Sequence, residues 1–398
     1  MNPELARRIA FTLGALLVYR LGSHIPLPGV SPAVWDQMFQ AQEGGGLIGM
    51  LNAVSGGALA RLSVFSLVIV PYVSAAILVQ LARFLVPRLR ALQHAGEAGR
   101  RAIERSTLAL TVLIAAFQSY GIAGGLEGVP NLVPEPGPWF RLTTLLTLTA
   151  GTLFVTWLAW QITARGVGNG IALILCLGVV LQLPQGILAT LELGRRDLLS
   201  GNLIAGLALL SVALTALVVA MEKARRCEPV VFPDARRAPG QLAFKLNGAG
   251  VMPALIAAWV VALPLAAVAL FAPDAAGFGR AFTHGAPLYM LAYAIVIVFC
   301  VYLYTAFVLD PAETAERLRH LGGAIPQVAP GEATAEHLDG VLSRVTLIGA
   351  GYFVVICLIP ELLISWAQVP FYLGGTSLLV LVCTVLDLET EVRGQMGG

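Results

Sequence analysis

Long apolar stretches alternate with polar connectors along the whole of this 398-residue chain. Each stretch can cross a hydrocarbon core of about 30 Å as a helix, which takes roughly 20 residues. The pattern predicts an all-α, multi-pass membrane protein, because helices satisfy their own backbone hydrogen bonds in lipid. The ten predicted transmembrane helices cover residues 8–25, 63–84, 106–124, 141–163, 169–190, 201–221, 248–271, 286–308, 342–360 and 371–387.

Composition also indicates a membrane protein. Hydrophobic residues make up 57% of the chain and charged residues only 12%, whereas about 25% charged is usual in a soluble domain. The first apolar run follows Arg7 and Arg8, as the core of a secretory signal peptide would. It ends near Arg20 and His24 rather than at a small-residue cleavage site, and further spans follow. We therefore expect a retained first span.

Basic residues are concentrated in alternate loops. Ten spans put both termini on one side, and about three quarters of the 25 Lys and Arg residues fall on that side. The positive-inside rule makes this side cytoplasmic. Both termini are expected there, together with three polar segments at 85–105, 222–247 and 309–341.

Motifs for catalysis or metal binding are absent from the sequence. It contains no P-loop, no zinc-protease or serine-hydrolase motif and no Cys/His cluster. Ionisable residues are nearly absent from the spans, although ion-coupled transport usually needs them at mid-membrane depth. We expect no enzyme activity, no cofactor and no metal. A secondary transporter built on inverted repeats, which has a similar number of spans, is the alternative.

A glycine-rich segment at 44–59 fits neither a span nor an exposed loop. It is too short and too rich in glycine to span, yet too apolar for water. Irregular backbone at membrane depth is tolerated where it lies within protein or lines a cavity. The segment is therefore expected to be a short half-inserted helix inside a funnel, with an interfacial amphipathic helix as the alternative.

Short motifs along nearly the whole chain resemble the SecY family, in the family's order. They cover residues 19–29, 55–59, 71–77, 165–171, 247–253, 330–334, 346–349 and 371–377. The resemblance implies two inverted halves of five helices around a central pore, here 1–190 and 191–398. It also implies a protein-conducting channel that passes unfolded polypeptides and releases hydrophobic segments laterally into lipid.

The resemblance assigns two elements to the pore. Segment 46–60 would be the plug that fills the external funnel, with the residues Leu51, Asn52, Ser55, Gly56 and Gly57. The constriction would be a ring of aliphatic side chains, which blocks ions by dewetting when empty. The six ring positions are Ile69, Val73, Leu175, Val179, Leu255 and Val380.

Gating and docking roles also follow from the resemblance. Gln118 and Asn247 match the polar cluster of the family's lateral gate, whose hydrogen bonds would hold the gate shut. The loops 222–247 and 309–341 would dock cytoplasmic partners. Their candidate docking residues are Arg225, Arg226, Arg236, Arg237 and Ala329.

The implied partners are SecE-like and SecG-like membrane subunits, a SecA-like motor or a ribosome, unfolded polypeptides and lipid. The implied location is the bacterial cytoplasmic membrane. This chain has Ala329 where the family usually carries an arginine, and the loop 222–247 is shorter than usual. We therefore expect weakened docking and a specialised member of the family.

Overall fold

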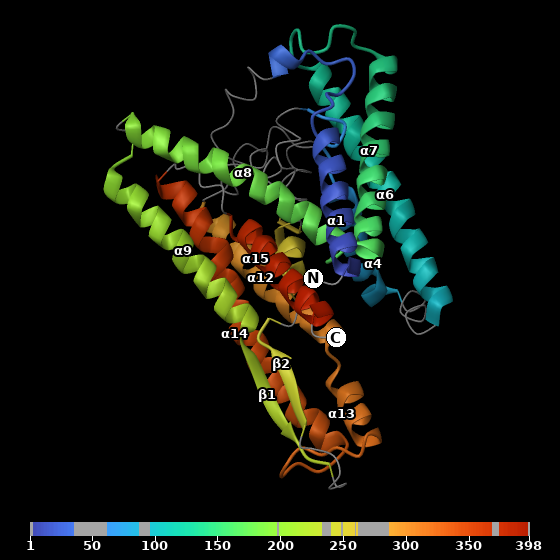
Figure 1. Cartoon of the computed structure of the whole chain (residues 1–398), viewed down its shortest axis with the longest axis vertical. Coiled ribbons are helices and arrows are strands. Elements are labelled where there is room, and N and C mark those ends of the chain that lie inside the picture. Colours follow the sequence, from blue (N-terminus) through green and yellow to red (C-terminus); the bar gives the residue numbers. More distant parts are fainter. Residues whose placement is uncertain are drawn as a thin grey trace. The chain divides into compact units, whose positions relative to one another are not determined.

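The computed structural model describes residues 3–35, 62–86, 96–196, 199–232, 240–247, 250–258, 260–261, 286–367 and 374–396, and these are mostly helical (Figure 1). Contacts divide the chain into two compact units. Unit 1 comprises Met1–Thr190 and Thr384–Gly398, and unit 2 comprises Leu191–Cys383.

Unit 1 is built from long helices. They are α1 (Pro3–Gly22), α4 (Val70–Leu85), α6 (Gly96–Glu127), α7 (Pro138–Arg165) and most of α8 (Gly170–Arg195). Helix α6 packs along α4 and α7, and α1 packs against α7. A buried cluster that includes Leu27, Leu132 and Leu148 joins α6 and α7 to the connectors around them.

The second predicted span differs from the structure at its start. Residues 62–69 form successive turns, and the α-helix begins only at Val70. Buried serines hold these turns, because the Ser66 hydroxyl donates to the Ser63 carbonyl at 2.6 Å and Ser63 Oγ accepts the Phe65 N–H at 3.2 Å. Local side-chain bonds of this kind compete with a helix. Span prediction from hydropathy alone does not detect them.

Unit 2 contains the remaining helices and a small sheet. The helices are α9 (Gly201–Lys223), α12 (Pro287–Val308), α13 (Pro311–His320), α14 (Glu332–Ala367) and the first part of α15 (Gly375–Met396). The strands are β1 (Arg225–Val230) and β2 (Gly240–Lys245). Helices α12 and α13 both pack against α14.

Six helices of the described residues are long and apolar enough to cross a membrane: α6, α7, α8, α9, α12 and α14. Each overlaps a predicted span. Helices α1, α4 and α15 overlap three more, and the described part of the seventh is helical over 252–258. Helices α6 and α14 begin at Gly96 and Glu332, well before their predicted spans.

Two predicted loops fold together into one structure, which we call the hairpin subdomain (225–232, 240–245 and 311–342). Strands β1 and β2 pair antiparallel, from Arg225 with Lys245 to Val230 with Gly240. Val231 and Ala324 exchange backbone hydrogen bonds of 2.9 Å in both directions. The hairpin lies beside α14 (Figure 1). A buried cluster packs the hairpin against α13 and α14; its members are Val230, Phe244, Ala315, Leu318, Ile325 and Leu338.

Candidate functional site

Four of the six predicted ring residues lie in unit 1, all of them buried. Ile69 is the N-cap of α4, and its carbonyl accepts the Val73 N–H at 3.0 Å. Ile69 and Val73 are therefore one helical turn apart, as predicted for two residues on the same helix face, although the helix itself starts after Ile69. Leu175 and Val179 lie one turn apart within α8. Every one of these side chains is aliphatic, so none offers a hydrogen bond to a passing peptide or ion.

The other two predicted ring residues lie in unit 2. Leu255 is half-buried in the helical stretch 252–258, and Val380 is buried in the first half of α15. The first four ring residues thus belong to unit 1 and the last two to unit 2. That the six residues together form one pore ring stays a prediction.

Asn247 holds the start of the predicted seventh span. Its side-chain nitrogen Nδ2 donates to the Glu222 carboxylate at the end of α9 and to the Gly250 carbonyl at 3.2 Å. The amide orientation follows from this contact, because the reverse assignment would put oxygen against carboxylate. The sequence analysis did not identify Glu222 as the partner of Asn247. The available signal was a carboxylate at the end of an otherwise apolar helix. The Asn247–Glu222 hydrogen bond joins α9 to the chain that leads into the next span.

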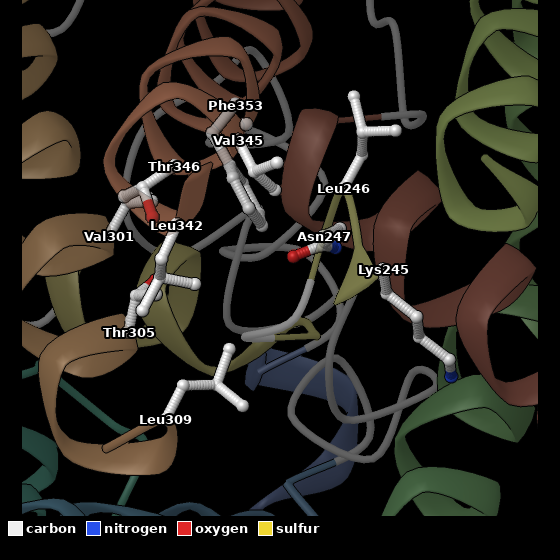
Figure 2. Close-up of a pocket in the computed structure, with 11 residues that line it drawn as sticks. Lys245, Leu246, Asn247, Val301, Thr305, Leu309, Leu342, Val345, Thr346 and Phe353 are labelled. Carbon is white, nitrogen blue, oxygen red and sulfur yellow. The ribbon is translucent and has the colours of Figure 1, made fainter. Parts of the chain in front are cut away.

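The other side of the Asn247 amide faces a small pocket in unit 2. Figure 2 shows Oδ1 directed toward Thr305 and Leu342, away from Lys245. Oδ1 is buried and has no hydrogen-bond partner among the described residues. The pocket lies between α12 and α14, and most of the side chains that line it are apolar. A buried acceptor without a hydrogen bond lowers stability by about 1–3 kcal/mol. The Oδ1 atom of Asn247 is such an acceptor.

Gln118, the second predicted gate residue, lies in the middle of α6 and is half-buried. Its Oε1 is also buried and has no hydrogen-bond partner among the described residues of the chain. Gln118 belongs to unit 1 and Asn247 to unit 2. Both predicted gate residues thus present an unpaired acceptor within their own unit. That the two residues belong to one polar cluster of a lateral gate stays a prediction.

The plug and part of the docking set fall outside the described residues. Leu51, Asn52, Ser55, Gly56 and Gly57 lie in the undescribed stretch 36–61, and Arg236 and Arg237 lie in 233–239. Arg225 and Arg226 are exposed on β1, where the Arg226 guanidinium contacts the buried Glu228 carboxylate at 3.1 Å. Of the candidate docking residues, Arg225 and Arg226 are thus placed at the surface of the hairpin subdomain.

Ala329 occupies an exposed turn of the hairpin subdomain. Its carbonyl accepts the hydroxyl of the buried Thr334 at 2.8 Å, and the flanking Gln327 and Gly331 have φ of +67° and +102°. The backbone at this position is therefore fixed, while the side chain points to solvent. The Ala329 side chain is a methyl group and offers a partner no hydrogen-bond donor.

Comparison with known proteins gives full-length matches. Residues 63–389 match the family model described as SecY. The protein translocase subunit SecY of Escherichia coli (strain K12) is 41% identical over 411 residues, which cover 99% of this chain and 92% of the relative. The SecY subunit of Vibrio cholerae is 41% identical over 409 residues, covering 98% and 91%.

Solved structures share the fold. A structure described as a protein-conducting channel has a TM-score of 0.69, covering 98% of this chain and 93% of its own. Sec61 in a canine ribosome–channel complex from the endoplasmic reticulum has a TM-score of 0.68 with the same coverage. Their identities of 17% and 16% make this a likeness of fold.

Proposed function

Because this chain belongs to the SecY family, we propose that it forms the pore through which unfolded polypeptides cross the membrane and from which hydrophobic segments leave laterally into lipid. The full-length match carries this proposal, since 41% identity extends over 99% of the chain. The aliphatic character of the predicted ring fits this function, because such side chains form no lasting hydrogen bonds with the passing polypeptide. The secondary-transporter alternative is set aside, because the full-length relatives are protein translocase subunits.

The pore residues follow as parts of this proposal. Ile69, Val73, Leu175, Val179, Leu255 and Val380 form the constriction, and segment 46–60 is the plug that closes the external funnel. The burial of Ile69, Val73, Leu175, Val179 and Val380 and the absence of polar atoms from their side chains support the ring. The chain carries out no catalysis of its own, and a partner supplies the energy for movement.

The proposed partners bind the hairpin subdomain. One solved relative of similar fold is the yeast Ssh1 complex bound to an 80S ribosome, and another is Sec61 in a ribosome–channel complex. For this chain we propose a SecA-like motor or a ribosome at the hairpin subdomain, and SecE-like and SecG-like subunits in the membrane. The exposed Arg225 and Arg226 support this surface as the docking site.

The proposed orientation places both termini and the hairpin subdomain in the cytoplasm of a bacterium, because that side carries most of the basic residues. Reporters fused after residues 95, 235 and 325 should be cytoplasmic, and those after 132, 278 and 366 external. Alkaline phosphatase and fluorescent-protein fusions measure the two sides in parallel. An external reporter at 235 would overturn the topology.

The proposed lateral gate includes Gln118 and Asn247. Replacing Gln118 with Leu should shift the gate equilibrium by about threefold, since hydrogen bonds between helices in lipid contribute roughly 0.6 kcal/mol each. The measurement is the signal hydrophobicity needed for half-maximal membrane insertion. A Gln118→Asn variant, which keeps an uncharged amide, is the control. Identical thresholds for wild type and Gln118→Leu would leave Gln118 without a role in gating.

A further inference from the structure

The short loop between α7 and α8 (166–169) is held from two sides within unit 1. The Val167 N–H donates to the Thr12 hydroxyl of α1 at 3.0 Å. The Gly168 N–H donates to Glu391 Oε2 of α15 at 2.8 Å. A hydrogen bond to a carboxylate is roughly twice as strong as a neutral one. Two distant helices thus fix adjacent backbone groups of one loop.

Gly168 lets α15 approach this closely. Its φ of +84° lies in the left-handed region that favours glycine, and a Cβ here would lie 3.2 Å from both Leu173 and Leu388. Leu388 comes from α15, one turn before Glu391. The loop therefore packs against α15 as well as hydrogen-bonding to it.

The contacting residues of α15 share one face. Thr384 Oγ1 lies 3.5 Å from the Ala172 carbonyl of α8, and Leu388 and Glu391 follow at helical spacing. Residues three and four apart on a helix lie above one another. Val380 comes one turn before Thr384 on the same face, in the part of α15 that belongs to unit 2. Helix α15 thus carries the proposed pore residue Val380 in its first half and the contacts with α8 and the α7–α8 loop in its second half.

We propose that Glu391 is a positioning residue, which fixes the end of α15 to the α7–α8 loop and so sets the depth and rotation of Val380 in the pore ring. This inference rests on the proposed function. The two residues are separated by about three helical turns, or roughly 16 Å at 1.5 Å per residue. Helix α15 is continuous from Gly375 to Met396, so a slide or turn of the helix at Glu391 is transmitted along its axis toward Val380.

The test compares Glu391→Ala with Glu391→Gln in the full channel complex. Glutamine keeps an acceptor oxygen at the same reach, whereas alanine has none. Hydrogen exchange of the Gly168 amide should become about ten- to a hundredfold faster in Glu391→Ala and change far less in Glu391→Gln. The ion conductance of the idle channel in a planar bilayer should also rise more in Glu391→Ala than in Glu391→Gln. Glu391→Asp, which is one methylene shorter, should give intermediate values for both.

The outcomes separate this inference from the proposed function. Unchanged Gly168 exchange in Glu391→Ala would overturn the attachment. Faster exchange with unchanged conductance would overturn the positioning of Val380 and leave the channel function standing. Equal leakage of Glu391→Gln and Glu391→Ala would also overturn it, because the hydrogen bond would then not be the cause. A failure of the channel function itself shows elsewhere, as the absence of photo-crosslinks between a stalled polypeptide and positions 175 and 255.

Discussion

Replacing Leu175 and Leu255 with serine is expected to make the idle channel leak ions. An aliphatic ring excludes water, and a dry constriction blocks ions. Each Leu→Ser change removes roughly 1.5–3 kcal/mol of apolar transfer free energy, which corresponds to about a ten- to hundredfold larger population of water-filled rings. Because both changes act on the same ring, the double variant should leak more than either single variant. Single-channel recording in a planar bilayer measures it.

A matched control separates the ring from a general effect of serine in a membrane helix. Leu209 of α9 is 72% exposed and lies on an apolar helix outside the proposed ring. Leu209→Ser should leave the idle conductance at the wild-type level. If Leu175→Ser and Leu255→Ser also leave it there, the ring does not lie at these residues.

Introducing an arginine at position 329 is expected to strengthen docking of a SecA motor or a ribosome. Arginine offers a planar set of donors to a carboxylate or carbonyl surface, and one well-formed charged hydrogen bond contributes roughly 1.5–3 kcal/mol. Affinity should therefore rise by about ten- to a hundredfold. The structure favours such a contact, because the turn at Ala329 is exposed and its backbone is fixed by Thr334. Motor affinity for reconstituted channels, at one salt concentration, is the measurement.

Charge alone could raise affinity by attracting an acidic partner, so the control adds the same charge elsewhere. Ala312 is exposed near the start of α13 in the same subdomain. Ala312→Arg should change affinity far less than Ala329→Arg. If the wild-type channel binds the motor as tightly as Ala329→Arg does, the argument for a specialised channel with weakened docking is lost.

The helical architecture could be predicted from the sequence because bilayer thickness fixes the length of a span. The six long apolar helices each overlap a predicted span, and the family resemblance is confirmed by the full-length matches. Hydropathy could not place the start of α4. There, Ser63 and Ser66 stabilise turns within an apolar stretch, and a side-chain contact of that kind leaves no trace in average hydrophobicity.

The hairpin subdomain and the polar contacts of the spans required the structure. Leu242 and Phe244 are apolar residues two apart in β2, which was the available sequence signal for that strand, whereas β1 (Arg225–Val230) has no such alternation. The packing of both strands against α13 and α14 joins segments far apart in the chain, which no local pattern reveals. The same holds for Glu391, whose partner Gly168 is 223 residues away, and for Glu222 beside Asn247.

Site-specific photo-crosslinking of a stalled polypeptide tests the central claim most directly. A secretory chain fused to a tightly folded domain should halt inside the channel, with its unfolded part in the ring. Photo-reactive residues placed at Leu175 and Leu255 should then capture this chain in a manner that depends on the motor or ribosome, while the same residue at Leu209 should capture lipid. Capture at Leu209 but not at Leu175 or Leu255 would contradict a polypeptide path through this pore.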